Sequence, residues 1–421
     1  MKASSYFDPH TPYGKIIFLL SPYRHIVLRS KSTYNKCLTN SGFYWIITKD
    51  FIELVTQSGR ATMAFKKKYQ LVGVDIGSYA IKVVEIEQNK KGRFLKNFGI
   101  IGLPRHAIRE GDIVEQDQVA EALKKLFKNL KIRNQNVAVA LSGYPVMAKR
   151  ISLPNSKREE IEATIHDQAE QYIPFDINDV NLDFDILEDQ ETPSEGEDAD
   201  EERSLDVMLV AAKKDVIDAY INLLVAADLN PGVLDVDVFA LQNAAELNVT
   251  GEKEGYAIVN VGAEELGINT VVGGSSLFSR DSSFGGAQIT ELIMGHFDVD
   301  FETAEEIKLG AVKDKPWDQN LETSVSGVIS DWAQEIKRAL DFVDTTYSDK
   351  TVGKIFVCGG SCRIKGFQKY LEAHTGLPVV ELNPFANLIP NPDLFDEKYL
   401  DHIAPQACVA TGLALRSIDD K

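Results

Sequence analysis

The feature that most constrains the fold is an apolar strand that runs into an acidic glycine turn, with the sequence LVGVDIGS at residues 71–78. Lys82 follows seven residues after Asp75 and begins a second strand-like run, KVVEI. A hairpin of this kind can wrap a phosphate chain, because backbone N–H groups face the oxygens, a lysine neutralises charge and an aspartate holds a hydrated metal ion. The turn therefore predicts nucleotide binding, and it places the start of the folded body near residue 69.

Two further glycine turns lie at the ends of predicted strands. The strand over 256–261 contains the sequence NVGA at 260–263, and the strand over 354–358 leads into Gly359, Gly360 and Ser361. Glycine lets the backbone approach a flat ligand, and the helix start after the third turn can meet a phosphate. Each turn alone is also typical of an ordinary hairpin or loop. Together they favour a cleft that clamps a phosphate chain from both sides.

A helix predicted over 303–308 adds a weaker signal. It carries Glu305 and Lys308 on one face, because residues three apart in a helix are neighbours. The pair could hydrogen-bond a ribose, but most such pairs are solvated ion pairs of little energetic consequence.

Composition excludes several classes of function. The 421 residues predict two or more lobes, and no apolar run approaches the roughly 20 residues that span a bilayer. The net charge of −18 argues against nonspecific binding to nucleic acid or to anionic lipid, and it leaves open both a basic partner and simple solvation. The four cysteines fit a reducing compartment, and Cys358 and Cys362 are interpreted as buried small side chains in preference to a metal site. We therefore expect a cytoplasmic protein.

The order of elements indicates two related lobes. Three strands, a helix over 116–130 and a strand over 136–142 form one unit, and a second run of three strands begins at residue 256. Between them, nine of the fifteen residues at 188–202 are acidic, which predicts a mobile hairpin tip. Residues 1–62 lack any sustained period. We expect translation to begin at Met63 and residues 1–62 to be a non-native or disordered extension.

At this point the chain resembles a known family. The order of the three turns, Asp237 and the Glu305–Lys308 pair is similar to the nucleotide elements of the actin, heat-shock chaperone and sugar kinase fold. Within that fold the chain looks most like the PilM family, the actin-like proteins of type IV pilus assembly. The supporting words are KKK at 66–68, VGVDIGS at 72–78, QYIPF at 171–175, DVFALQ at 237–242, FGG at 284–286 and ATGLALR at 410–416.

The resemblance implies a fold class and a division of the chain. The fold would be α/β, actin-like and related to ribonuclease H, with two lobes around a nucleotide cleft. The first lobe would cover 63–250 and carry an inserted FtsA-like subdomain at about 149–225. The second lobe would cover 251–395, and a C-terminal helix at 396–421 would return to the first lobe.

The resemblance also implies roles for the matching residues, with ATP and Mg²⁺ as the bound groups. The phosphates would be contacted by Gly77, Ser78, Lys82, Asn260, Gly262 and Ala263. Asp75 would hold Mg²⁺ through water, and Glu305 and Lys308 would contact the ribose. Gly359, Gly360 and Ser361 would line the adenine and phosphate side, and Asp237 would be the catalytic residue that orients the attacking water.

One departure from the family pattern concerns hydrolysis. The second phosphate turn usually begins with aspartate, whereas this chain has Asn260. An amide can accept a hydrogen bond from metal-bound water, but it brings no negative charge to Mg²⁺. Because hydrolysis depends on electrostatic positioning of metal and water, we expect ATP binding with weak or no ATPase activity.

The resemblance also implies partners. In the PilM family the inserted subdomain helps form a groove for the short N-terminal cytoplasmic peptide of the inner-membrane protein PilN, and other platform proteins and the assembly ATPase are further candidate partners. The chain would then be peripheral at the inner membrane through its partners, without a span of its own. The alternatives are an FtsA-like filament-forming division protein, a type II secretion component and a sugar kinase. FtsA usually ends in a basic amphipathic helix, which the sequence after Leu413 lacks.

Overall fold

The computed structural model describes most of the chain from residue 70 to residue 417, together with the backbone of strand β1 (Ile17–Leu19). Within that range it leaves out residues 110, 155, 157, 188–203, 250–254, 313–314 and 349. The predictions for Met63, for the acidic residues 188–202 and for all of residues 1–62 except β1 therefore lie outside the described residues.

The first sheet has seven strands, with a meander of three antiparallel strands next to a parallel set. Their order is β1, β11 (Asn230–Val236), β7 (Asn136–Leu141), β2 (Val72–Ile76), β3 (Ala80–Asn89), β4 (Gly92–Gly102) and β17 (Ile389–Pro390). Strand β2 pairs antiparallel with β3 and parallel with β7, and β7 pairs parallel with β11. The parallel strands are almost continuously apolar because helices cover both faces of the sheet.

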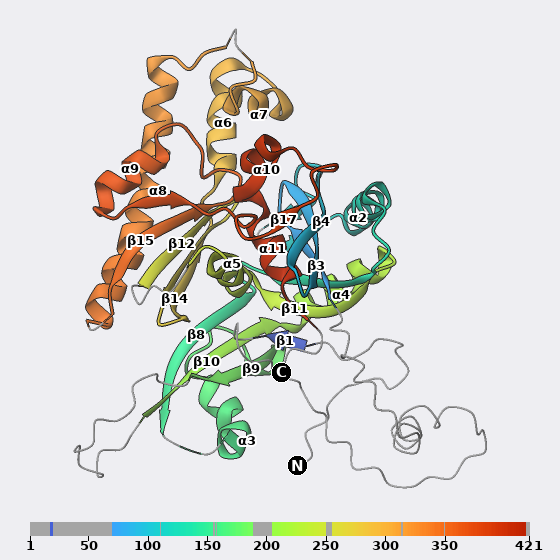
Figure 1. The fold of residues 1–421 in the computed structure, drawn as a ribbon. Helices are drawn as coiled ribbons and strands as arrows, with labels where there is room; N and C mark the ends of the chain where they lie inside the picture. The colour runs from blue at the N-terminus through green and yellow to red at the C-terminus, as the bar shows by residue number, and fades with distance from the viewer. Residues whose placement is uncertain are drawn as a thin grey trace.

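Alternate residues of β7 show how the first sheet is covered (Figure 1). Val137 and Val139 belong to the core beneath helices α2 (Gln116–Leu130) and α4 (Lys214–Ala226), whereas Ala138 packs beneath α5 (Asp237–Glu246) and α11 (Cys408–Ala414). Small alanines on the second side let α5 and α11 lie close to the sheet. At Gly412 a Cβ would sit 1.7 Å from the Ala240 carbonyl oxygen, so these two helices can cross only because Gly412 has none.

The second sheet repeats the topology of the first. Its order is β14 (Ser275–Ser282), β13 (Leu266–Val272), β12 (Gly255–Val261), β15 (Val352–Cys358) and β16 (Val379–Glu381). In each sheet a meander of three antiparallel strands stands beside parallel strands, which is the repeat expected from the sequence, and the first sheet adds β1 and β17 at its edges. The covering helices are α6 (Gly286–Phe297), α7 (Phe301–Lys308), α8 (Gln319–Thr346) and α9 (Phe367–Thr375).

A separate three-stranded sheet lies below the first in Figure 1, at the place expected for the inserted subdomain. Strand β10 (Ser204–Lys213) is central and pairs antiparallel with β8 (Val146–Pro154) and β9 (Val180–Ile186). Helix α3 (Arg158–Ala169) ends five residues before Pro174. The Tyr172 and Ile173 N–H groups close a turn on the Ala169 carbonyl, because the residue before Pro174 disfavours helical geometry.

Short elements complete the fold. Strands β5 (Ile108–Arg109) and β6 (Asp112–Ile113) form a small hairpin, and η1 (Ile177–Asp179) precedes β9. The chain end contains α10 (Glu397–Ile403), the 3₁₀ turn η2 (Ala404–Ala407) and α11, so the C-terminal segment is interrupted where Pro405 removes a backbone donor.

The returning segment reaches the first lobe in two places. Strand β17 pairs with β4, and it lies before the proposed boundary at residue 395. The Arg416 Nε donates to Asp235 Oδ2 at 2.7 Å, and both residues are buried. The lobe boundaries at residues 250 and 395 remain predictions. Within the described residues, no helix is both long enough and apolar enough to cross a bilayer.

Candidate functional site

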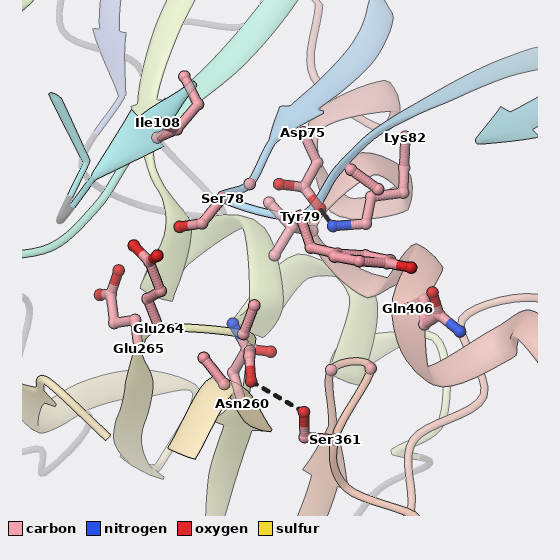
Figure 2. Close-up of a pocket in the computed structure, with 18 of the residues that line it drawn as sticks. Asp75, Ser78, Tyr79, Lys82, Ile108, Asn260, Glu264, Glu265, Ser361 and Gln406 are labelled. Atoms are coloured by element: carbon pink, nitrogen blue, oxygen red, sulfur yellow. Dashed lines mark hydrogen bonds and ion pairs between the residues drawn. The ribbon is translucent and has the colours of Figure 1, made fainter. Parts of the chain in front are cut away.

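A cavity of about 210 Å³ lies between the two lobes (Figure 2). Its walls come from the ends of β2 and β12, the loop after β15, and helices α5, α7 and α11. All thirteen residues singled out in the sequence line it, namely Asp75, Gly77, Ser78, Lys82, Asp237, Asn260, Gly262, Ala263, Glu305, Lys308, Gly359, Gly360 and Ser361. Turns that are up to 286 residues apart thus meet in one place.

The first turn carries balanced charges. Asp75 on β2 is the register partner of Lys82 on β3, and the Lys82 Nζ lies 3.2 Å from Asp75 Oδ2. The Gly77 N–H closes the turn by donating to the Ala80 carbonyl at 3.2 Å. The Asp75–Lys82 pair remains partly open to the cavity, so both side chains are available to a ligand that brings charge of its own.

The second and third turns are bonded into one unit. The Ser361 N–H donates to the Val261 carbonyl at 3.0 Å, and the Ser361 hydroxyl donates to the Gly262 carbonyl at 2.9 Å, which is the contact dashed near Ser361 in Figure 2. Gly359 has a φ of 85°, and a Cβ there would lie 2.6 Å from Asn260 Oδ1. Only glycine therefore allows β12 and the loop after β15 to approach this closely.

The second turn also holds the start of α6. The Gly262 N–H donates to the Glu265 carbonyl at 2.8 Å, which closes the turn. The Gly262 and Ala263 carbonyls accept from the N–H groups of Gly286 and Ala287, at 3.0 and 2.8 Å. These bonds fix the turn to the helix behind it, so its geometry is set by the second lobe.

Glu305 and Lys308 on α7 form a buried network, in contrast to a solvated surface pair. The Lys308 Nζ lies 2.5 Å from Glu305 Oε1 and 2.8 Å from the Thr290 hydroxyl, which in turn bonds to Glu305. Desolvation lowers the pKa of Lys308, although the charge of Glu305 opposes this effect. A buried ion pair contributes little net stability, because desolvation offsets the attraction.

Three carboxylates crowd the back of the cavity around Gly267. Asp237 is the first residue of α5 and is 5% exposed, and Glu265 immediately precedes β13. A Cβ on Gly267 would lie 3.1 Å from Asp281 Oδ1 and 4.0 Å from Asp237 Oδ2, so glycine leaves room for both groups. Among the described residues, Asp237 Oδ1 and Glu265 Oε1 are buried without a hydrogen-bond partner.

This crowding disfavours the charged forms. Desolvation, and next the charge of Asp281, raises the pKa of Glu265 to about 8. The same two causes, in the same order, raise the pKa of Asp237 well above its usual value. Desolvation also raises the pKa of Asp281, although part of this residue still faces solvent. Three carboxyl groups, Asp237 from the first lobe and Glu265 and Asp281 from the second, therefore lie together, and no salt bridge within the described chain pairs any of them with a cation.

Several residues at the cavity were not predicted from the sequence. Tyr79 follows the first turn, and its ring lies 6.2 Å from that of Phe301 across the cleft mouth. Gln406 follows Pro405 in η2, and Ser142 follows β7. Glu265 and Tyr79 are adjacent to predicted turns, so their position in the sequence could have indicated that they line the cavity. Ser142 and Gln406 have no local signal, because only the folded chain brings them to the cavity.

The residues present fit a hydrated Mg²⁺ better than a dehydrated ion. Among the described residues, no group of three or more histidine, cysteine, aspartate or glutamate side chains is placed to hold a metal. Mg²⁺ keeps several of its waters and needs only one or two carboxylates plus phosphate oxygens. Such waters could donate hydrogen bonds to Asp75 and to the unpartnered oxygens of Asp237 and Glu265.

Comparisons with known proteins agree with this arrangement. The family described as Type IV pilus assembly protein PilM matches residues 73–418. The solved structure titled "PilM-PilN type IV pilus biogenesis complex" has 28% sequence identity and a TM-score of 0.73, and the match covers 84% of this chain and all of that one.

Two further solved structures show lower similarity. The ethanolamine utilization protein EutJ from Carboxydothermus hydrogenoformans has 17% identity and a TM-score of 0.48, with 83% of this chain and 90% of that chain covered. MreB 5 of Spiroplasma citri bound to AMPPNP has 12% identity and a TM-score of 0.46, with 82% and 95% covered.

Proposed function

The chain belongs to the PilM family of type IV pilus assembly proteins, and from this premise we propose that it is an ATP-binding adaptor that docks the N-terminal cytoplasmic peptide of PilN. Family membership and the repeated sheet topology confirm the predicted actin-like fold. The FtsA-like, secretion and sugar kinase alternatives are not favoured by the family match. Other platform proteins and the assembly ATPase are further proposed partners, and the chain would associate with the inner membrane through them.

The nucleotide would be ATP with Mg²⁺. The observation that carries this proposal is the meeting of three glycine turns and the Glu305–Lys308 pair in one interlobe cavity. Backbone N–H groups of the first two turns, with Ser78 and Lys82, would hold the phosphates. Asp75 would hold the hydrated ion. The buried pair would meet the ribose, and the third turn would lie against the adenine and phosphates.

Hydrolysis would be weak or absent. Asp237 lies at the cavity wall with one unpartnered oxygen, as a water-orienting carboxylate requires. Asn260, however, is an uncharged amide whose Oδ1 accepts from the Cys358 thiol at 3.8 Å. Without an aspartate at this position the turn positions metal and water less firmly, so we expect turnover below about 1 s⁻¹, the low end for typical enzymes.

The peptide would dock where the small sheet meets the first lobe. Tyr144, in the loop before β8, is 70% exposed, and its ring lies 5.5 Å from the ring of Phe175. The Lys213 Nζ lies 5.2 Å from the Tyr144 ring centroid and 5.1 Å from that of Phe175. An exposed aromatic pair beside a cation suits recognition of a peptide with apolar side chains and carbonyl groups. The similarity to the PilM–PilN complex supports PilN as the partner.

A peptide titration tests the docking proposal. We expect a synthetic peptide of the PilN cytoplasmic tail to bind the full chain in a fluorescence anisotropy assay. Tyr144→Ala should weaken binding about tenfold or more, because exposed aromatic anchors dominate such interfaces. Tyr370→Ala is the matched control, since Tyr370 is an exposed aromatic residue on α9 of the second lobe. Absence of binding by the unmodified chain, with and without ATP, would remove the partner proposal.

A further inference from the structure

The second phosphate turn lacks a charge at Asn260 but has a carboxylate five residues later. We propose that Glu265 supplies that missing carboxylate, by accepting a hydrogen bond from a water of the Mg²⁺ that accompanies bound nucleotide. Glu265 would thus face Asp75 of the first turn from the opposite side of the cavity. This inference rests on the nucleotide binding proposed above, and it assigns a positioning role to a residue outside the family pattern.

The position of Glu265 is fixed by the turn itself. Its carbonyl accepts the Gly262 N–H at 2.8 Å, so its backbone belongs to the phosphate turn. Its side chain lines the same cavity as Asp75 and Ser78. In Figure 2 the carboxyl groups of Glu264 and Glu265 extend into the space between the two turns, on the Ser78 side. A carboxylate here can reach the region where a phosphate-bound cation would lie.

The hydrogen bonding of Glu265 is half complete. Its Oε2 accepts from the Ser142 hydroxyl at 3.1 Å, and the Gly143 N–H also bonds to the carboxyl group, so the opposite lobe holds the side chain. Its Oε1 is buried and has no partner among the described residues, and the same is true of Asp237 Oδ1. A buried carboxylate oxygen without a donor is unfavourable, so each of these atoms calls for a donor that the described chain does not provide. Waters on a cation are such donors, and the cation also offsets the crowded negative charge.

Asn260 cannot perform this task alone. Its amide oxygen can orient water, but it is neutral, and it already faces the Cys358 thiol and the Gly359 backbone. Hard cations such as Mg²⁺ favour charged oxygen ligands and donors. The competing explanation is that Glu265 acts only as a strut, joining the lobes through Ser142. The two explanations differ in one measurable respect, because a strut does not depend on the cation.

The test compares nucleotide affinity with and without Mg²⁺. A fluorescent ATP analogue is titrated into the full chain and into Glu265→Gln, which keeps the shape and removes the charge. In EDTA the two dissociation constants should agree within about twofold. In Mg²⁺ the variant should bind about 10- to 100-fold more weakly, the range typical for loss of an outer-shell metal partner. Adding Asn260→Asp to Glu265→Gln should restore most of the Mg²⁺ effect by returning a carboxylate to the turn.

A matched control separates the strut from the positioning role. Glu291 joins the lobes through Arg105, at 3.1 Å, and it does not line the cavity. Glu291→Gln should therefore leave the Mg²⁺ effect unchanged. If Glu265→Gln keeps the full Mg²⁺ effect, the inference is overturned while nucleotide binding stands. If the unmodified chain binds no nucleotide in either condition, the proposed function itself fails.

A second readout guards against misfolding. Without ligand, Glu265→Gln should melt at the same temperature as the unmodified chain or higher, because the neutral amide does not share the unfavourable desolvation of the buried carboxylate. If that variant does not fold, Glu265→Asp is measured in its place, because it shortens the side chain by one methylene and keeps the carboxylate. The Glu265→Asp variant should need a higher Mg²⁺ concentration for half-maximal nucleotide binding. An unchanged Mg²⁺ requirement would contradict the proposal.

Discussion

The two phosphate turns occupy equivalent places in sheets of the same topology, yet their charges differ. On the first turn, Asp75 and Lys82 pair across neighbouring strands, so acid and base offset each other. On the second turn, Asn260 is neutral. The carboxyl groups of Glu265 and of Asp237 on α5 lie behind it, and among the described residues no cation forms a salt bridge with either of them. The first turn carries its own counter-charge, whereas we propose that the second depends on a cation brought by the ligand.

We expect this difference to divide nucleotide binding between the lobes. The first turn would contact phosphate oxygens directly through Lys82, whose ammonium group can bond to both Asp75 and a phosphate. Residues 260–265 include no lysine or arginine to meet a bare phosphate chain. Their carboxyl groups would instead accept hydrogen bonds from the waters of a phosphate-bound Mg²⁺.

The largest effect should come from breaking the first turn. Lys82→Ala removes the one cation of the Asp75–Lys82 pair and leaves Asp75 facing the phosphates. We expect nucleotide affinity, measured by isothermal titration calorimetry, to fall about 100-fold, since a charge-assisted bond contributes about 1.5–3 kcal/mol and uncovered repulsion adds to it. Lys124→Ala, an exposed lysine on α2 paired with Asp228, is the control and should change affinity less than twofold. Equal effects of both variants would contradict the assignment of the first turn.

A smaller effect should follow from adding charge to the second turn. Asn260→Asp places a further carboxylate beside Glu265 and Asp237. Without ligand we expect the melting temperature to fall by several degrees, because a buried like charge costs about 1–2 kcal/mol. Saturating Mg²⁺ and ATP should recover most of that loss, and ATP in EDTA should not. Recovery by ATP in EDTA would show that the second turn does not depend on the cation.

The three turns could be predicted from the sequence because each is a local pattern at the end of an apolar strand. Gly77, Gly262 and Gly359 are recognisable from their neighbours, and the repeat places two of the turns in equivalent positions. The interruption of the C-terminal segment at η2 could also be predicted from the sequence, because Pro405 cannot continue a helix. The sequence-based expectation of one helix over 396–421 gave too little weight to that proline.

The hydrogen bond that holds the Glu265 carboxylate could not be predicted, because it joins the two lobes. Ser142 lies 123 residues before Glu265, and no local pattern joins them. The buried state of the Glu305–Lys308 pair likewise follows from the packing of α7 against Thr290 of α6. Local spacing identified the pair, but only tertiary structure separates a solvated pair from a buried one.

The pH dependence of stability offers a finer comparison between a ligand-facing carboxyl and a purely structural one. Burial raises the pKa of Asp183 on β9 to about 8, as it does for Glu265. Both stay protonated in the folded chain at pH values where the unfolded chain ionises. The contribution of these two groups to the free energy of unfolding is therefore fully present below about pH 4, and it is lost as the pH rises through about 8.

Two variants separate the contributions of Asp183 and Glu265 to the pH dependence of the melting temperature. We expect the melting temperature to fall between pH 5 and pH 9, and Asp183→Asn and Glu265→Gln each to reduce that fall by a few degrees. Mg²⁺ and ATP should suppress the contribution of Glu265 but not that of Asp183, which is remote from the cavity. Thermal melts by differential scanning calorimetry provide the measurement. Equal suppression at both sites would indicate a general stabilisation by ligand instead of a local cation effect.

The smallest effect should come from the cleft mouth, where the lobes touch without either turn. Arg105 pairs with Glu291 at 3.1 Å, and its guanidinium lies 5.2 Å from the Phe301 ring centroid. Because the ion pair is exposed, it contributes at most about 1 kcal/mol and is screened by salt. Arg105→Ala should therefore lower the melting temperature by about 2 °C or less and change nucleotide affinity less than about threefold. A loss as large as that of Lys82→Ala would mean that the mouth contacts, and not the charges of the two turns, govern how the lobes hold their ligand.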